Sequence, residues 1–279
     1  MSLCGKGTER DPHTMVKQLL STIERTFMKE QLYTIPLNDA VNAGDECPFC
    51  FIERNVEQDL LDFVLGSGSS YMEADIREMT DKAGFCRQHF QKMFDYGNTL
   101  GNAWILKTHY QKIISEMKNE FAHFRPGKSS FKDKFRKTAE SGNAIGIWVK
   151  EKENSCYICS HLADTYTRYM DTFFYLWKQD EEFREKIENG KGFCLHHFGD
   201  LCEASDSRLS NSEKDSFYHA MFPLMENNMA RLAEDVAWMV EKFDYRNKDA
   251  DWKNSRDAIQ RGMQKLKGGY PADGPYKPK

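Results

Sequence analysis

Apolar side chains recur every three or four residues through most of this chain, at the spacing that places them on one face of an α-helix. The first such stretch spans residues 13–31, and its apolar face carries one large side chain per turn: Met15, Leu19, Ile23 and Phe27. No stretch shows the regular alternation of apolar and polar residues that is typical of a half-buried strand. The pattern therefore predicts an all-α protein.

Residues 33–40 interrupt the helical pattern, and Pro36 disfavours a helical conformation of the residue before it. We expect an extended segment there. Helical spacing resumes over residues 51–65 and ends at a Gly- and Ser-rich stretch. A short polar helix at 72–82 and one or two long helices over 86–124 complete the first half.

The second half repeats this order of elements. Helices are predicted from the second cysteine pair to Trp177, and at residues 180–188, 194–205, 212–243 and 251–266. Ser212 and Asp215 resemble the capping box that opens a helix, so the longest of these helices should begin there. Residues 268–279 are rich in Gly, Pro and Lys, and we expect them to be disordered.

This repetition predicts an internally duplicated protein with a basic linker between its halves. The linker carries six basic residues between Arg125 and Lys137 and is interpreted as a solvated connection. The predicted segments are an N-terminal amphipathic helix at 1–32, a first repeat at 33–124, the linker at 125–142, a second repeat at 143–246, and a C-terminal helix with a flexible tail at 247–279.

Each half also contains a Cys-x2-Cys pair followed by Gly-Phe-Cys-x2-His-Phe. The residues are Cys47, Cys50, Cys86 and His89 in the first half, and Cys156, Cys159, Cys194 and His197 in the second. Thirty-five residues separate Cys50 from Cys86, and thirty-four separate Cys159 from Cys194. The same residue types in the same order at nearly equal spacing indicate a repeated metal-ligand pattern.

Zinc chemistry explains why these residue types occur together. A Cys-x2-Cys turn lets two sulfurs converge on one ion, and residues three apart on a helix lie on the same face. The positive end of a helix dipole favours the thiolate that binds metal. Three thiolates and one imidazole satisfy a four-coordinate zinc ion. We therefore predict two structural Cys3His zinc sites, one in each half, each tying the two ends of a helical hairpin together.

Two other uses of these cysteines are considered. An iron–sulfur cluster is the main alternative cofactor, because cysteine thiolates hold such clusters and histidine sometimes substitutes. Cys47-Pro-Phe-Cys50 also resembles a glutaredoxin-type redox motif, but the βαβ context of that motif is missing. His196 could replace His197 as a ligand, although the first half has Gln88 at the equivalent position, which favours His197.

Composition narrows the function classes. The net charge of −4 argues against a nucleic-acid partner. No apolar run is long enough for a membrane span, and the N-terminus does not resemble a signal peptide. We therefore expect a cytoplasmic protein whose cysteines stay reduced or bind metal. The sequence contains no recognisable catalytic constellation, so a non-enzymatic interaction or regulatory module is favoured. Its partner stays unidentified, and a protein is the class considered. A redox protein with iron–sulfur clusters or reactive metal-bound thiolates is the alternative.

Several stretches resemble an uncharacterised bacterial family that carries a domain-of-unknown-function label. They are Ile35-Pro-Leu-Asn-Asp-Ala, Cys47-Pro-Phe-Cys50-Phe-Ile-Glu-Arg, both Gly-Phe-Cys-x2-His-Phe motifs and Lys242-Phe-Asp-Tyr-Arg-Asn. The resemblance spans roughly residues 33–266, and the cysteine motifs are its most specific part. It implies a duplicated helical protein and supplies no activity, substrate or partner.

Overall fold

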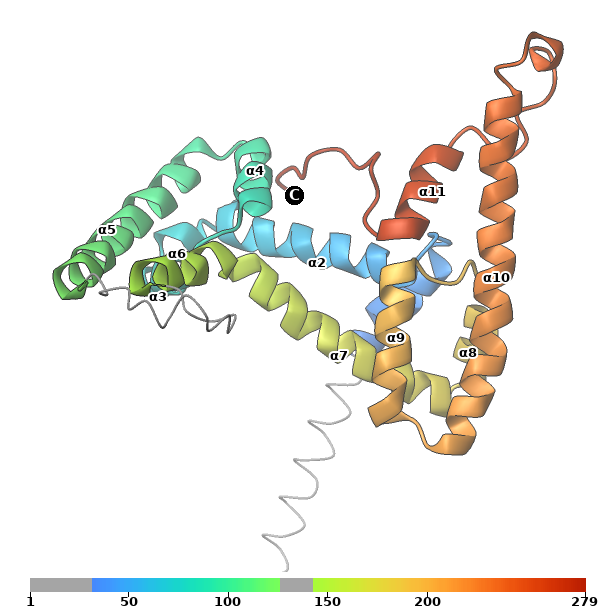
Figure 1. Cartoon of the computed structure of the whole chain (residues 1–279), viewed down its shortest axis with the longest axis horizontal. Coiled ribbons are helices and arrows are strands. Elements are labelled where there is room, and N and C mark those ends of the chain that lie inside the picture. Colours follow the sequence, from blue (N-terminus) through green and yellow to red (C-terminus); the bar gives the residue numbers. More distant parts are fainter. Residues whose placement is uncertain (1–31, 126–142) are drawn as a thin grey trace, which may run out of the picture. The chain divides into compact units, whose positions relative to one another are not determined.

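The computed structural model describes residues 32–125 and 143–279, and these residues form helices without any strand (Figure 1). Residues 32–42 are helical. The α-helices that follow are α2 (Pro48–Leu65), α3 (Ala74–Ala83), α4 (Arg87–Tyr96), α5 (Thr99–His123), α6 (Ala144–Asn154), α7 (Tyr157–Gln179), α8 (Glu181–Glu188), α9 (Leu195–Arg208), α10 (Asn211–Glu241) and α11 (Ala258–Lys267). Short 3-10 turns occur at η1 (Ser70–Met72) and η3 (Tyr245–Asn247). The all-α prediction is confirmed for the described residues.

Two predicted segments fall wholly or largely outside the described ranges. These are the amphipathic helix at residues 13–31 and the basic linker at 125–142. Within the described ranges, no helix is both long and apolar enough to cross a membrane.

The segment around Pro36 is helical, so the prediction of an extended stretch at residues 33–40 is wrong. Tyr33, Leu37 and Ala40 lie on one face of this helix and are buried. Proline removes one backbone hydrogen bond, at a cost of about 3 kcal/mol inside a helix. Burying a single large apolar side chain gains about 1.5–3 kcal/mol, so the buried face outweighs the proline.

The N-cap residue of the long helix α10 is Ser210, two residues before the predicted Ser212. The backbone N–H of Ser210 donates to the carboxylate of Glu213 at 2.7 Å, and these two residues form the capping box. The pair Ser212 and Asp215 is therefore not the cap. Ser210 and Glu213 match the Ser-x-x-Glu pattern in full, and the longer glutamate side chain reaches back to the N-cap amide.

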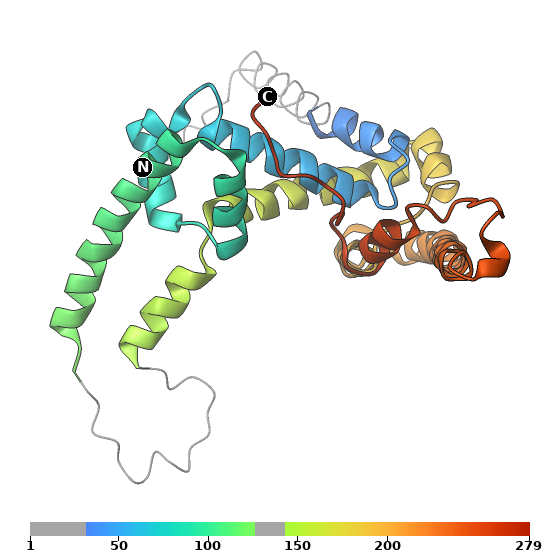
Figure 2. The same ribbon diagram turned by 90° about the horizontal axis from the view of Figure 1, so that it is seen from above.

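The chain divides into two compact units. Unit 1 comprises Met1–Ile52 and Arg168–Tyr270, and unit 2 comprises Glu53–Thr167 and Pro271–Lys279. The boundaries fall inside α2 and α7, so each of these helices contributes residues to both units. Within unit 1, α11 lies beside α10 in both views (Figures 1 and 2).

Each unit has its own apolar core. In unit 1, Phe173 is fully buried, and its ring centroid lies 5.7–5.8 Å from those of Phe49, Phe183 and Phe193. The aromatic residues of α7 around Phe173 therefore form a packing surface. In unit 2, the core is built from α2, α4, α5 and the start of α7: Leu61, Val64, Met93, Ile105 and Ile158 are among its buried members.

The last nine residues make side-chain contacts with α2 inside unit 2, although their composition predicts disorder. The Arg54 Nε lies 3.1 Å from a carboxylate oxygen of Asp273, and the Tyr276 hydroxyl donates to Glu57 at 2.5 Å. Lys279 pairs with Asp59 at 2.5 Å. The charged face of α2, with Arg54, Glu57 and Asp59, thus pairs with complementary groups of the tail, an interaction that composition alone does not show.

Candidate metal centres

All eight predicted ligands lie in two clusters of three cysteines and one histidine. Centre 1 lies in unit 1 and centre 2 lies in unit 2. Centre 1 contains Cys47, Cys50, Cys194 and His197, and centre 2 contains Cys86, His89, Cys156 and Cys159. In each group the ligand atoms all lie within 4.8 Å of one another. Both clusters could hold a metal ion.

The predicted pairing of the ligands within each half is wrong. The Cys-x2-Cys pair of one half meets the Cys-x2-His pair of the other half, in both centres. The reason is helix length. After Cys50, α2 continues to Leu65, which is 15 residues or about 22 Å, whereas α3 has only 10 residues and spans about 15 Å. The chain therefore does not come back to Cys47 and Cys50 by the time it reaches Cys86.

Centre 1 is fully enclosed. The Nδ1 atom of His197 lies 3.3 Å from Cys47 Sγ, 3.4 Å from Cys50 Sγ and 3.2 Å from Cys194 Sγ. The sulfurs of Cys50 and Cys194 are 3.7 Å apart. All four residues are buried. A Cβ atom at Gly268, whose φ is +79°, would touch the sulfurs of both Cys50 and Cys194, so the backbone after α11 covers this centre closely.

Centre 2 has the same internal geometry but is partly open to solvent. The Nδ1 atom of His89 lies 3.2 Å from the sulfurs of Cys86 and Cys156 and 3.3 Å from that of Cys159. The sulfurs of Cys86 and Cys159 are 3.8 Å apart. Cys159 is exposed and Cys86 is half-buried, whereas His89 and Cys156 are buried. Solvent therefore reaches two of the three thiols of centre 2.

These separations match the edges of a tetrahedron around one ion. A tetrahedral zinc ion with bonds of about 2.3 Å to sulfur and 2.0–2.1 Å to nitrogen holds its sulfurs about 3.8 Å apart and each sulfur about 3.6 Å from the nitrogen. The observed S–S distances of 3.7 and 3.8 Å agree with this. The S–N distances of 3.2–3.4 Å are shorter by at most about 0.4 Å. One divalent ion fits each cluster.

Helix N-termini position the cysteines. Cys86 is the N-cap residue of α4, and Cys194 is the N-cap residue of α9. The backbone N–H of His197 donates to Cys194 Sγ at 3.4 Å, and that of Cys159 donates to Cys156 Sγ at 3.5 Å. Amides and helix dipoles directed at sulfur favour the thiolate form that a metal requires.

The glycine of each Gly-Phe-Cys motif has a conformational role. Gly84 and Gly192 have φ values of +64° and +71°, in the left-handed region that other residues rarely adopt. A Cβ atom at Gly84 would lie 3.0 Å from the ring of His109, and one at Gly192 would lie 3.1 Å from the sulfur of Met225. Each glycine therefore turns the chain tightly into a ligand-bearing helix. The adjacent phenylalanines, Phe85 and Phe193, are buried.

The thiols of each centre compete for ionisation. In centre 1, burial raises the pKa of Cys47 well above its usual value, whereas hydrogen bonds with Cys47 and Cys50 lower the pKa of Cys194. In centre 2, burial opposes ionisation of Cys156, but its contact with His89 lowers the pKa to about 6. Burial and the neighbouring Cys156 raise the pKa of Cys159 to about 12. Three thiolates can coexist at such short separations only when a cation neutralises them.

A buried carboxylate orients the histidine of centre 2. The Nε2 atom of His89 lies 2.8 Å from Glu57 Oε1, on the side of the ring opposite the thiols. Burial opposes the charge of Glu57, but hydrogen bonds from His89, Lys92 and Tyr276 lower its pKa to about 2. A carboxylate that accepts the second N–H of a ligating imidazole fixes its tautomer and raises its basicity. No pattern in the local sequence indicates this role of Glu57.

Replacing Glu57 by glutamine is expected to weaken zinc binding at centre 2 by about 10–100-fold. The amide can still accept a hydrogen bond from His89, but it carries no charge to polarise the ring. Zinc affinity is measured by competition with a chromophoric chelator. Centre 1 of the same chain is the internal control, because its histidine ring packs against Phe49 at a centroid distance of 5.6 Å. Equal weakening of both centres would contradict a local role for Glu57.

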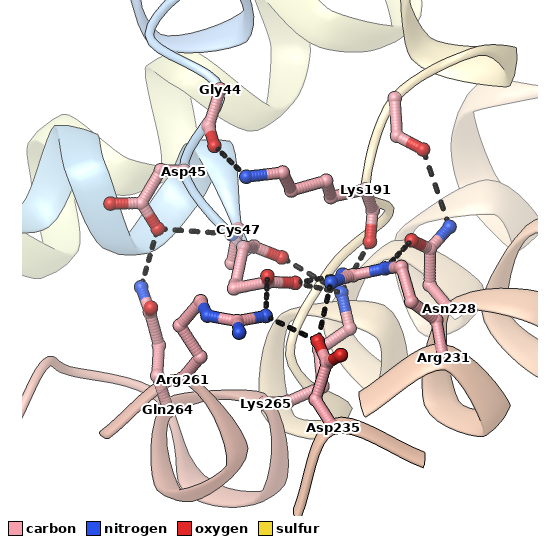
Figure 3. A network of polar contacts seen from close by, with 12 residues as sticks. Gly44, Asp45, Cys47, Lys191, Asn228, Arg231, Asp235, Arg261, Gln264 and Lys265 are labelled. Atoms are coloured by element: carbon pink, nitrogen blue, oxygen red, sulfur yellow. Dashed lines mark hydrogen bonds and ion pairs between the residues drawn. The ribbon is translucent and has the colours of Figure 1, made fainter. Parts of the chain in front are cut away.

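The surroundings of centre 1 contain a buried charge network (Figure 3). Glu46, which precedes Cys47, has a side chain only 1% exposed. Its carboxylate lies 2.5 Å from Arg231, 3.4 Å from Arg261 and 3.6 Å from Lys265. The Lys265 ammonium also donates to the Glu46 carbonyl at 2.9 Å. These contacts join α10 and α11 to the start of α2, so they hold the first cysteine pair in place.

In the described ranges, the other histidines lie outside the two quartets. His196 is exposed and lies 3.7 Å from Asp200, whereas His197 belongs to the quartet of centre 1; His196, His197 and Asp200 form a further group of possible ligands. The Nδ1 atom of His109 lies 3.1 Å from the carbonyl of Asp81, and its ring packs against Gly84. His109 thus supports the turn that leads to Cys86.

Comparisons with known proteins give a family but no activity. The model of a family of unknown function, DUF6062, matches residues 28–273. No curated protein and no solved structure matches the chain.

Proposed function

The chain belongs to this family of unknown function, DUF6062, and we propose that it is a zinc-binding, non-enzymatic interaction or regulatory module. The observation that carries the proposal is the pair of Cys3His quartets with tetrahedral ligand separations. Each zinc ion would join helices that are far apart in the sequence, and so fix the geometry of a helical scaffold.

Zinc is favoured over an iron–sulfur cluster by the spacing of the ligands. A cluster places several iron atoms between its thiolates, whereas the sulfurs here are only 3.7 and 3.8 Å apart and suit a single ion. Three thiolates and one imidazole are a common donor set for structural zinc. An iron–sulfur redox protein is the alternative that the metal analysis below distinguishes.

The donor count favours a structural role for both ions. A catalytic zinc site keeps one position open for water or substrate, whereas four protein ligands fill a tetrahedral site. This argument is strongest for the buried centre 1. Zinc bound by thiolates is also consistent with a reducing, cytoplasmic environment, and this localisation stays a prediction.

We also propose that the two halves arose by duplication. Each half supplies one cysteine pair at the start of a long helix, α2 or α7, and one Cys-x2-His pair at the start of a shorter helix, α4 or α9. The reciprocal exchange supports the idea, because each half contributes the same two pairs of ligands, one pair to each centre.

A surface of unit 2 suits a protein partner. Large apolar side chains are exposed on α5 and α6: Leu106, Tyr110, Ile114, Phe121, Ile147 and Val149. Nearby, a cavity of about 800 Å³ is lined by residues that include Cys86, Ile113 and Trp148. Clustered exposed apolar side chains mark interaction surfaces. Because Cys86 is a ligand of centre 2, metal binding there would stabilise one wall of this cavity.

Purified protein is expected to contain about two zinc ions per chain and to be colourless, because each quartet is a complete tetrahedral site. Elemental analysis and an absorption spectrum of protein purified without air check this. Removal of the zinc by a strong chelator should lower the melting temperature, since the ions bind the folded chain only. A brown protein that contains iron and absorbs near 400 nm would instead support the redox alternative.

A further inference from the structure

A second cavity, in unit 1, has a lining that is predominantly basic. Its volume is about 730 Å³, and it lies between the loop after α8, helix α10 and the segment that leads into α11. Five basic side chains and one acidic side chain line it: Lys191, Arg231, Lys253, Arg256, Arg261 and Asp257. Three of the five cations, Lys191, Arg231 and Arg261, are drawn in Figure 3.

The cations fall into two groups. Arg231 and Arg261 form ion pairs with Glu46, and Arg261 also pairs with Asp235 at 3.0 Å. Asp257, the acidic lining residue, pairs with Arg261 at 2.8 Å. These contacts neutralise the two arginines and hold them rigidly at the base of the cavity.

The charged groups of the other three cations contact only neutral groups in the described part of the chain, although the backbone N–H of Lys253 donates to the Asp251 carboxylate at 2.9 Å. Lys191 donates to the carbonyl oxygen of Gly44 at 2.6 Å. The Lys253 ammonium lies 4.0 Å from the ring centroid of Trp238, and the Arg256 guanidinium lies 5.9 Å from that of Trp252. About three positive charges therefore stay uncompensated around one cavity, in a chain whose net charge is −4.

We propose that this cavity binds a small-molecule anion that carries at least two linked phosphate groups. A diphosphate group matches the uncompensated charge, and guanidinium and ammonium groups are the side chains that bind phosphate oxygens best. The volume lies within the 300–1,000 Å³ range of small-ligand sites. An overall acidic protein repels anions elsewhere, so binding would be directed to this basic region.

The site is partly preorganised. Lys253 has a φ of +51°, a left-handed conformation that non-glycine residues adopt at an energetic cost. Its ammonium rests on the Trp238 ring, whose Nε1 donates to the carbonyl of Asp251 at 2.9 Å. The lysine is thus held on the rim of the cavity before any ligand arrives. Less side-chain ordering is then needed on binding, which increases affinity.

The test is calorimetric titration of the full-length, zinc-loaded protein with inorganic pyrophosphate at low salt. We expect saturable binding that weakens as salt is added. Lys253→Gln and Arg256→Gln should each weaken binding by about tenfold or more, because each removes a charge-assisted hydrogen bond. Lys248→Gln is the matched control, since Lys248 is exposed and does not line the cavity, and it should leave binding unchanged.

Two further titrations identify the source of the phosphate. Orthophosphate should bind more weakly than pyrophosphate. ATP binding at least as tightly as pyrophosphate would support a nucleotide as the ligand, whereas weaker ATP binding with intact pyrophosphate binding would support a smaller diphosphate. The proposal is overturned if pyrophosphate does not bind, if both cavity variants bind it like the wild type, or if the heat change is matched by zinc loss in elemental analysis.

Discussion

Replacing Glu46 by leucine is expected to lower the free energy of unfolding by about 3–5 kcal/mol. The Glu46 side chain is almost completely buried, and it contacts Arg231, Arg261 and Lys265. Lys265 is equally buried, with a side chain only 1% exposed. Removal of the carboxylate leaves these cations close together without their shared anion. Breaking a buried ion pair on one side is costly because the partner charge stays desolvated.

Denaturant titration followed by circular dichroism measures this loss. The matched control is Glu182→Leu, because Glu182 pairs with Lys186 at 2.8 Å but is 77% exposed. An exposed pair contributes only about 0–1 kcal/mol, so the control should barely shift the transition. Zinc content of both variants is determined in parallel, since Glu46 adjoins the ligand Cys47. Equal shifts for the two variants would show that the network around Glu46 adds no stability.

Helical periodicity was sufficient to predict most of the described fold. Positions 51–65 and 180–188 match α2 and α8 closely, because each combines a clear apolar face with a recognisable end signal. The failure at residues 33–40 has a different origin. Pro36 disfavours a helix locally, but the burial of Tyr33 and Leu37 stabilises one. This burial is a tertiary effect that the local sequence does not show.

The identity of the metal ligands could be predicted, but their pairing could not. Residue type and spacing depend on local chemistry, so Cys86-x2-His89 is recognisable on its own. Which cysteine pair it meets depends on the lengths and directions of α2 and α3, and these are global properties. The prediction that the two pairs of one half bind the same ion is therefore the part that fails.

The residues that support the centres were also missed, for a related reason. Glu57 lies in the largely polar run Glu53–Asp59 of α2 and looks like an ordinary surface position until Lys92 and Tyr276 are brought to it. Glu46 acquires its partners from α10 and α11, which are more than 180 residues away in the chain. The sequence contains one signal of this kind: Glu46 is a charged residue directly before the ligand Cys47.

Double cysteine variants are expected to reveal the exchanged pairing through large but unequal losses of zinc. Cys47→Ser combined with Cys194→Ser removes two ligands from centre 1 and leaves all four ligands of centre 2. Cys47→Ser combined with Cys86→Ser damages both centres. Removal of one thiolate leaves an incomplete donor set, so a chelating resin should strip zinc from each damaged site and spare an intact one.

The most direct test of the account is elemental analysis of these two variants after such treatment. The account predicts about one zinc ion per chain for the Cys47/Cys194 variant and none for the Cys47/Cys86 variant. The reverse result, with zinc retained only when Cys47 and Cys86 are both replaced, would contradict it and restore a pairing within each half.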